Sequence, residues 1–213
     1  MNRIIRFIYS LFFYSLTGLG ISLTIKADIG VSSFNSMNVA ISNAIHMKVG
    51  SITILINLLF LLGYMILTQF SKPLKYTLQV ISVLCLGLII NIFTHYSFIN
   101  MLISNYILKL LVFIFGTIIA GFSTGMVINF DTITFPIESF CLALADKMSY
   151  SFVKLRYLVD IFSIITSLVV SYLFNLSFFV REGAVISLIL LSAVINLTKK
   201  IYYNFFTKNT SNS

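Results

Sequence analysis

Long uncharged apolar runs, separated by short polar segments, dominate the chain. Nineteen uncharged residues lie between Arg6 and Lys26, and similar runs cover residues 49–71, 76–108, 110–130, 161–180 and 183–198. A helix needs about 20 mostly apolar residues to cross the hydrocarbon core of a bilayer. The pattern therefore predicts six transmembrane helices, near residues 5–25, 50–70, 76–95, 107–128, 152–174 and 182–198.

Two polar interruptions separate a long apolar run from a short one. They cover Lys26 to Ser33 and Asn129 to Pro136, and the apolar segments that follow are too short to cross a bilayer. We interpret these short segments, residues 34–45 and 137–145, as half-helices that either re-enter the membrane or lie at its edge. Ser32 is placed to cap the first, and Pro136 suits the first turn of the second, where a backbone N–H has no intrahelical partner.

The interruptions occupy equivalent places in a weak internal repeat. Shifting the chain by 103 residues aligns the two regions without a gap over about 45 residues. Each copy has small residues four apart, a spacing that lets helices pack closely in lipid. Simple apolar packing without wider symmetry is the alternative. The identical pairs are Phe12/Phe115, Gly18/Gly121, Ile25/Ile128, Asp28/Asp131, Ser36/Ser139 and Ala40/Ala143.

Three crossings in each half would insert the second half with the opposite sense to the first. The sequence therefore predicts an all-α polytopic membrane protein with six transmembrane helices in two inverted three-helix repeats and short broken or re-entrant helices. The halves are residues 5–95 and 107–198 of a single transmembrane domain, 1–213, which ends in a short polar tail, 201–213. Many secondary transporters have inverted halves and a midplane site where broken helices meet.

The composition excludes a water-soluble domain. Hydrophobic residues make up 59% of the chain and charged residues only 9%, against about 25% charged residues in soluble domains. Mean hydropathy is +1.02. The lipid bilayer is therefore the expected solvent of this protein.

The net charge of +8 could suggest nucleic acid, but basic residues also collect on the cytoplasmic side of membrane proteins. With the N-terminus inside, six crossings put more basic residues inside than outside. We therefore expect a multi-pass protein of a bacterial cytoplasmic membrane, with both termini cytoplasmic and no nucleic-acid partner. The inner set is Arg3, Arg6, Lys72, Lys75, Lys147, Lys154, Arg156, Lys199, Lys200 and Lys208, and the outer set is Lys26, Lys48, Lys109 and Arg181.

A charged pair inside a predicted span is the first candidate for a functional site. Asp160 lies about 12 Å into the helix that begins near Phe152, at about 1.5 Å per residue, where an acid is costly and usually functional. Arg156 is one turn earlier on the same face, within reach of Asp160, and the repeat places Asn57 at the position equivalent to Asp160. A structural ion pair that joins neighbouring helices is the alternative.

A second set of polar residues lies at the two interruptions. A free helix N-terminus attracts an anionic group, whereas Glu138 would attract a cation. The alternative is that these residues only cap the half-helices. Together with the charged pair and Asn57 they form the candidate substrate-binding residues. The set is Asp28, Ser32 and Asn35 in one half and Asp131, Thr134 and Glu138 in the other.

Residues 18–35 resemble the first-half signature of a group of bacterial membrane proteins. That signature runs roughly G-x-G-x-A-L-x-x-x-A-D-L-G-x-S-P-W-D. Asp28, Gly30 and Ser32 match it, while the three residues after Ser32 replace its proline, tryptophan and final acid. The chain resembles the YczE/YyaS/YitT group, most closely its YczE-like branch.

The resemblance continues into the second half, where the group has a Gly-rich loop ending P-R-D and then R-x-x-x-E. Here Pro136-Ile-Glu138 and Arg156-Tyr-Leu-Val-Asp160 occupy those places, without the loop glycines. The likeness covers nearly the whole chain and implies a polytopic membrane fold more than an activity.

Three functions are compatible with these residues. A transporter or permease of a small molecule or ion, with a central polar site between the halves, leads. A substrate-binding subunit similar to the six-helix S-components of energy-coupling-factor importers, and a non-transporting accessory or scaffold protein, are the alternatives. No catalytic, metal or cofactor motif is present, so we expect no enzyme, no cofactor and no metal site. A homo-oligomer and a partner membrane complex both stay open.

Overall fold

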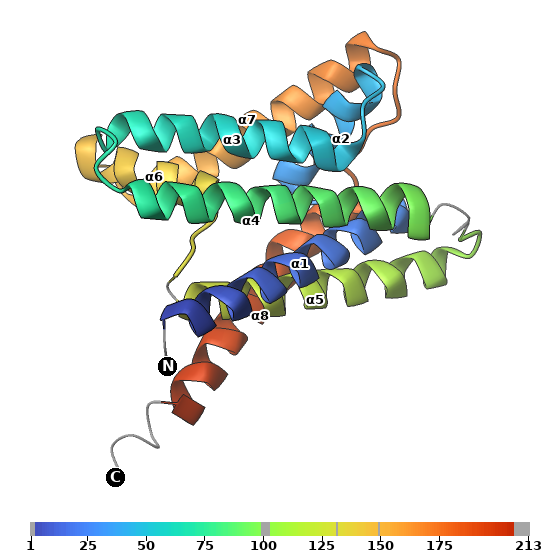
Figure 1. The fold of residues 1–213 in the computed structure, drawn as a ribbon. Helices are drawn as coiled ribbons and strands as arrows, with labels where there is room; N and C mark the ends of the chain where they lie inside the picture. The colour runs from blue at the N-terminus through green and yellow to red at the C-terminus, as the bar shows by residue number, and fades with distance from the viewer. Residues whose placement is uncertain (1–2, 99–102, 131, 149, 207–213) are drawn as a thin grey trace.

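The computed structural model describes residues 3–98, 103–130, 132–148 and 150–206, and every regular element in these ranges is a helix (Figure 1). The long helices are α1 (Arg3–Ala27), α3 (Val49–Leu67), α4 (Pro73–Ile92), α5 (Tyr106–Phe130), α7 (Phe152–Leu173) and α8 (Glu182–Phe206). The short ones are α2 (Ser33–Ala44), α6 (Pro136–Met148) and the π-helical turn η1 (Phe93–Ser97), which extends α4.

The two predicted half-helices are present as α2 and α6, with 12 and 13 residues. Helix α6 begins at Pro136, as predicted. Ser32 occupies the N-cap position of α2, but its side chain makes no capping hydrogen bond. The predicted capping by the Ser32 hydroxyl is therefore wrong, although the position of the helix start is right.

The predicted polar tail begins too early. Helix α8 continues to Phe206, so the first residues of the predicted tail, 201–213, are helical. Residues 201–206 contain no glycine or proline and are mostly apolar or aromatic. They therefore extend the helix that precedes them.

Among the described residues, five helices are long and apolar enough to cross a membrane: α1, α3, α4 with η1, α5 and α8. Each presents large apolar side chains outward, a surface that suits hydrocarbon and not water. This is a multi-pass membrane protein. Examples, each between 57% and 71% exposed, are Phe12, Leu59, Leu88, Phe115 and Ile189.

The sixth predicted span, residues 152–174, forms helix α7 of 22 residues. It lies outside the five membrane-crossing candidates. Its first three turns carry three charged residues, Lys154, Arg156 and Asp160.

Helices α1 and α5 cross with their backbones almost in contact. A Cβ atom on Gly20 would lie 2.6 Å from the carbonyl oxygen of Gly116 and 2.7 Å from the backbone nitrogen of Ala120. A Cβ atom on Gly116 would lie 2.9 Å from the Gly20 carbonyl oxygen. Glycine at both positions is what permits this crossing, which joins the two halves.

The predicted small-residue stripes mediate packing in both halves. Gly18 of α1 lies against Ile89 of α4, and Gly121 of α5 lies against Val194 of α8. Gly18 and Gly121 are 103 residues apart, and their contacts are 105 residues apart. The contacts are thus equivalent, with two extra residues in the second half before α8.

The short helices are exchanged between the halves. Helix α2 packs mainly on α7, and α6 packs mainly on α3. The 103-residue offset matches α2 to α6 and α3 to α7, so these two contacts are also equivalent. Each half therefore depends on the other for the packing of its short helix.

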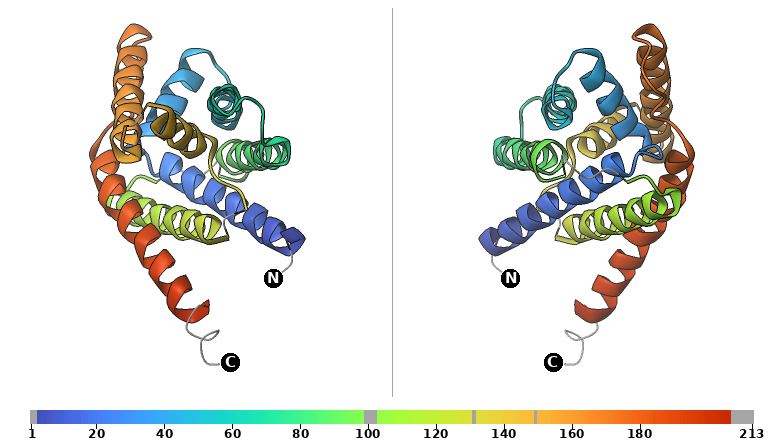
Figure 2. Two further views of the ribbon diagram at one scale, coloured as in Figure 1. Left: turned by 90° about the vertical axis from the view of Figure 1, so that its left-hand side faces the viewer. Right: turned by 90° about the vertical axis from the view of Figure 1, so that its right-hand side faces the viewer.

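The pair α3–α4 has no counterpart in the second half. The two helices pack closely at Gly50 and Gly87, where an added Cβ would meet the carbonyl oxygen of the other glycine. Asn91 joins them further, because its Oδ1 accepts a hydrogen bond from the Gly50 N–H at 2.8 Å and its Nδ2 donates to Ser51 Oγ at 3.1 Å. Within the described ranges α7 and α8 do not pack along their lengths, and Figure 2 shows α8 running away from α7.

Candidate functional site

A cavity of about 540 Å³ lies between the two halves. All eight α-helices contribute to its wall, which combines apolar side chains with many polar ones. A concave, mostly apolar space with a few polar groups is the usual form of a small-ligand site. The polar and charged lining residues are Thr17, Thr24, Ser32, Ser33, Asn35, Thr53, Asn57, Thr117, Thr124, Glu138, Arg156, Tyr157, Asp160, Ser187 and Ser192.

The first turns of both short helices form part of the wall. Ser33 and Asn35 of α2 line the cavity, and so do Ile137 and Glu138 of α6. The first turn of a helix has backbone N–H groups without intrahelical partners and carries the positive end of the helix dipole. The cavity therefore lies between two positively polarised helix ends, one from each half.

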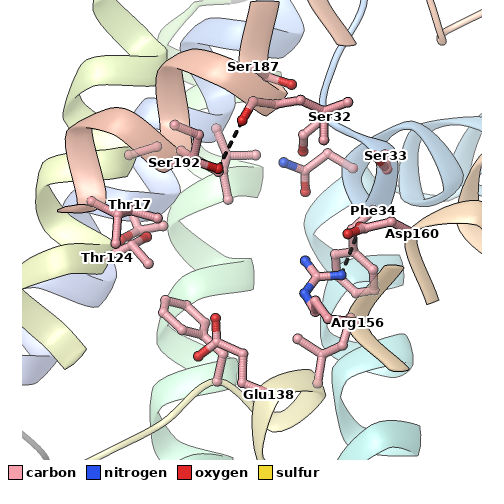
Figure 3. A pocket seen from close by; sticks show the side chains of 18 of the residues that line it. Thr17, Ser32, Ser33, Phe34, Thr124, Glu138, Arg156, Asp160, Ser187 and Ser192 are labelled. Carbon is pink, nitrogen blue, oxygen red and sulfur yellow. Dashed lines mark hydrogen bonds and ion pairs between the residues drawn. The ribbon is translucent and has the colours of Figure 1, made fainter. Parts of the chain in front are cut away.

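The predicted ion pair is present in the wall. Arg156 Nη1 donates to Asp160 Oδ1 at 2.7 Å, four residues apart on α7. The side chains are 31% and 19% exposed. Figure 3 shows this pair across the cavity from Thr17 and Thr124. The guanidinium and carboxylate largely neutralise each other at this wall.

Glu138 adds a charge that the pair does not balance. In the described part of the chain its carboxylate makes no hydrogen bond or salt bridge, and it lies at the edge of the cavity away from Asp160 (Figure 3). Arg156, Asp160 and Glu138 thus place one basic and two acidic side chains at this wall. Glu138 is the group that favours a cation here, whereas the two helix N-termini favour an anionic group.

Equivalent residues of the two halves meet at this cavity. In one half the residues are neutral, and in the other they are charged, so the shape of the wall is shared but its charge is not. Asn57 and Asp160, which the sequence repeat predicts to be equivalent, both line the cavity. Three pairs with an offset of 103 residues line the space: Asn35/Glu138, Thr53/Arg156 and Asn57/Asp160.

The neutral half is held by amide hydrogen bonds. Asn57 Nδ2 donates to the Thr53 carbonyl at 2.8 Å, and Asn38 Nδ2 donates to Thr53 Oγ1 at 3.2 Å. Asn38 is fully buried, and its Oδ1 has no partner among the described residues. Sequence reasoning missed Asn38, although its position one turn after Asn35 on a short polar helix was an available signal.

Two predicted site residues lie outside the cavity lining. Asp28 is 74% exposed and pairs with Lys109, whose Nζ is 3.0 Å from Asp28 Oδ2. Gln79 Nε2 donates hydrogen bonds to two atoms of Thr134, the backbone carbonyl oxygen at 2.8 Å and the side-chain Oγ1 at 3.1 Å. Both residues fix the loops that precede the short helices. Asp131 lies outside the described residues.

The hydroxyl groups that line the other side of the cavity could not be predicted from the sequence. Thr17 and Thr117 donate to carbonyls four residues earlier on their own helices, and Ser192 does the same on α8. Such bonds to the local backbone are ordinary for serine and threonine in helices. Their residue type alone therefore does not mark a site. In the described part of the chain no three His, Cys, Asp or Glu side chains are grouped to hold a metal ion.

Comparisons with known proteins agree with the predicted resemblance. A model of a family of unknown function, DUF6198, matches residues 1–200. The uncharacterized protein YyaS of Bacillus subtilis (strain 168) is 28% identical over 144 residues, which are 68% of this chain and 70% of YyaS. No solved structure matches the chain. The predicted resemblance of this chain to a YyaS-type family is therefore confirmed.

Proposed function

The chain belongs to the DUF6198 family of unknown function, and we propose that it transports a small solute through a central polar site between two inverted halves. The observation that carries this proposal is the cavity itself. It lies where the halves meet, and equivalent residues of both halves line it. In inverted-repeat transporters the substrate site lies at the repeat interface, beside the ends of broken helices.

The equivalent helix contacts support an inverted repeat. The α1–α5 crossing pairs equivalent helices through Gly20 and Gly116. The contact of α2 with α7 is equivalent to that of α6 with α3. Two halves with three crossings each, related in this way, would be able to move against each other around a fixed site, which is how such transporters expose a substrate alternately.

Arg156, Asp160 and Glu138 have distinct roles in this proposal. Glu138 holds a positive group of the solute, while Asp160, kept in place by Arg156, completes the polar wall. A charged group at membrane depth is costly and persists where it serves a ligand or ion pathway. Asn57 and Asn35 orient the solute through hydrogen bonds from the neutral half.

We expect Asp160→Asn and Glu138→Gln to lose solute binding and uptake while the protein stays folded, because both changes keep shape and remove charge. Purified protein would be screened by thermal shift against metabolites and ions. A solute at about 100 times its Kd adds about 2.7 kcal/mol to the free energy of unfolding. Uptake of each hit into proteoliposomes would then be measured. If the Asp160→Asn protein takes up the solute at the wild-type rate, Asp160 is not part of the binding site.

We further expect both termini in the cytoplasm and six crossings, because basic residues are concentrated on that side. The test places single cysteines at Ser71 and Ser104, both exposed, in a protein with Cys85→Ser and Cys141→Ser. An impermeant maleimide applied to intact cells should label position 104 and not position 71, and inverted vesicles should give the opposite result. Labelling of both positions from one side contradicts the topology.

A further inference from the structure

The central cavity continues to the outer surface of the protein between α7 and α8. Val153 and Tyr157 of α7 and Leu188 of α8 line the cavity. They are also 57%, 63% and 49% exposed. Residues that both line a cavity and lie on the outer surface mark an opening. Here the opening follows from the separation of α7 and α8 (Figures 1 and 2).

The sequence does not allow this opening to close as tightly as its counterpart between α3 and α4. There, Gly50 and Gly87 let the backbones touch. The position equivalent to Gly50 is Val153, by the 103-residue offset, and the position equivalent to Gly87 is Ser192, by the 105-residue offset of α8. Val153 and Ser192 both carry side chains that glycine lacks, so the backbone contact made at Gly50 and Gly87 has no counterpart at these positions.

The opening leads into the bilayer and not into water. Next to it, outside the cavity lining, Ile161 and Ile165 of α7 are 52% and 54% exposed, and Ile189 of α8 is 71% exposed. Such side chains face hydrocarbon in a membrane protein. A ligand that fits this space therefore needs an apolar part at the opening and a polar part at the charged inner wall.

Building on the proposed function, we propose that the ligand is a membrane amphiphile with an amine in its headgroup, admitted sideways between α7 and α8. The hydrocarbon chain lies against Leu188 and Tyr157. The amine meets Glu138, whose carboxylate makes no hydrogen bond or salt bridge among the described residues, and an adjoining phosphate meets the Arg156 guanidinium. Anionic headgroups without an amine place no donor against the Glu138 carboxylate and bind less well.

Three probes separate the features of such a ligand. Lysophosphatidylethanolamine has both the amine headgroup and the chain. Lysophosphatidylglycerol has the same chain and phosphate without the amine, and O-phosphoethanolamine has the headgroup without the chain. Each is added below its micellar concentration to purified protein in a neutral maltoside detergent. We expect only lysophosphatidylethanolamine to raise the melting temperature, by several degrees at saturation.

Two variants locate the binding. Leu188→Trp fills the opening and should reduce the affinity for lysophosphatidylethanolamine at least tenfold. Ile189→Trp adds the same bulk at the neighbouring residue, outside the cavity lining, and should leave that affinity unchanged. Glu138→Gln should bring the affinities for the two lysolipids together, because it removes the charge that selects the amine.

The outcomes separate this inference from the proposed function. If O-phosphoethanolamine or another soluble solute binds and the lysolipids do not, the transporter proposal stands and the sideways amphiphile is wrong. Equal loss of binding in Leu188→Trp and Ile189→Trp also overturns it. If the purified protein is a stable dimer in which copies crosslink through cysteine at position 188, a second copy covers the opening and the inference fails. If no solute or lysolipid binds, both proposals fail.

Discussion

Arg156→Ala should destabilise the protein more than Asp160→Asn. Arg156→Ala leaves the Asp160 carboxylate without its partner at 2.7 Å in a mostly apolar wall. Asp160→Asn leaves the Arg156 guanidinium without its carboxylate, but this long side chain is flexible and can reorient toward Glu138. Removing one partner of a fully buried pair costs about 3–5 kcal/mol. Because this pair is partly exposed, we expect roughly 1–3 kcal/mol for Arg156→Ala.

The matched control is Lys109→Ala, which breaks the Lys109–Asp28 pair at 3.0 Å. Asp28 is mostly exposed, and exposed pairs contribute little to stability, so the melting temperature should hardly change. Because the chain contains no tryptophan, the melting of all three variants is followed by static light scattering or by the access of a thiol reagent to Cys141. An Asp160→Asn protein less stable than Arg156→Ala would mean that Asp160 has further partners that matter more than Arg156.

Gly20→Ala should disrupt the α1–α5 crossing. The new methyl would lie 2.6 Å from the Gly116 carbonyl oxygen and 2.7 Å from the Ala120 nitrogen. These are backbone atoms on a packed helix, so the helices must separate. Overpacking of this kind costs about 1–3 kcal/mol, and the gain in helix propensity of about 1 kcal/mol offsets only part of it.

Gly63→Ala is the control for this change. A Cβ on Gly63 would lie 2.7 Å from the ring of Phe140, a side chain able to rotate, and not from backbone. The yield of monodisperse protein and the melting temperature should fall for Gly20→Ala and stay near the wild-type values for Gly63→Ala. Equal tolerance of both changes would show that the α1–α5 contact is not fixed at Gly20.

Most of the long helices could be predicted from the sequence, because a membrane-spanning helix needs a long apolar run and the length of each run can be counted in the sequence. The start of α6 was predictable from Pro136, since proline suits the first turn. The separation of α7 from α8 was not predictable from the hydrophobic pattern. Helices in lipid gain no hydrophobic energy by pairing, so their association depends on local fit, here on glycine at 50 and 87 against valine at 153.

The site was predictable where local spacing decided the contact. The pair Arg156–Asp160 follows from four-residue spacing within one helix, and Glu138 follows from its place at a helix start. Asp28 was also predicted from the sequence repeat, but it lies outside the cavity lining. Its backbone adopts φ 52° at the end of α1, and its side chain pairs with Lys109. A long-range partner of this kind leaves no trace in periodicity.

The exchange of α2 and α6 between the halves has a consequence for how the protein is made. When the ribosome has finished α4, helix α2 still lacks its main partner, α7, and α3 lacks α6. The first half must therefore wait in the membrane with the side of α2 that α7 later covers still open, and accessible to quality-control proteases. A chain truncated before α7 is expected to be degraded, and supplying residues 103–213 as a separate polypeptide should rescue it.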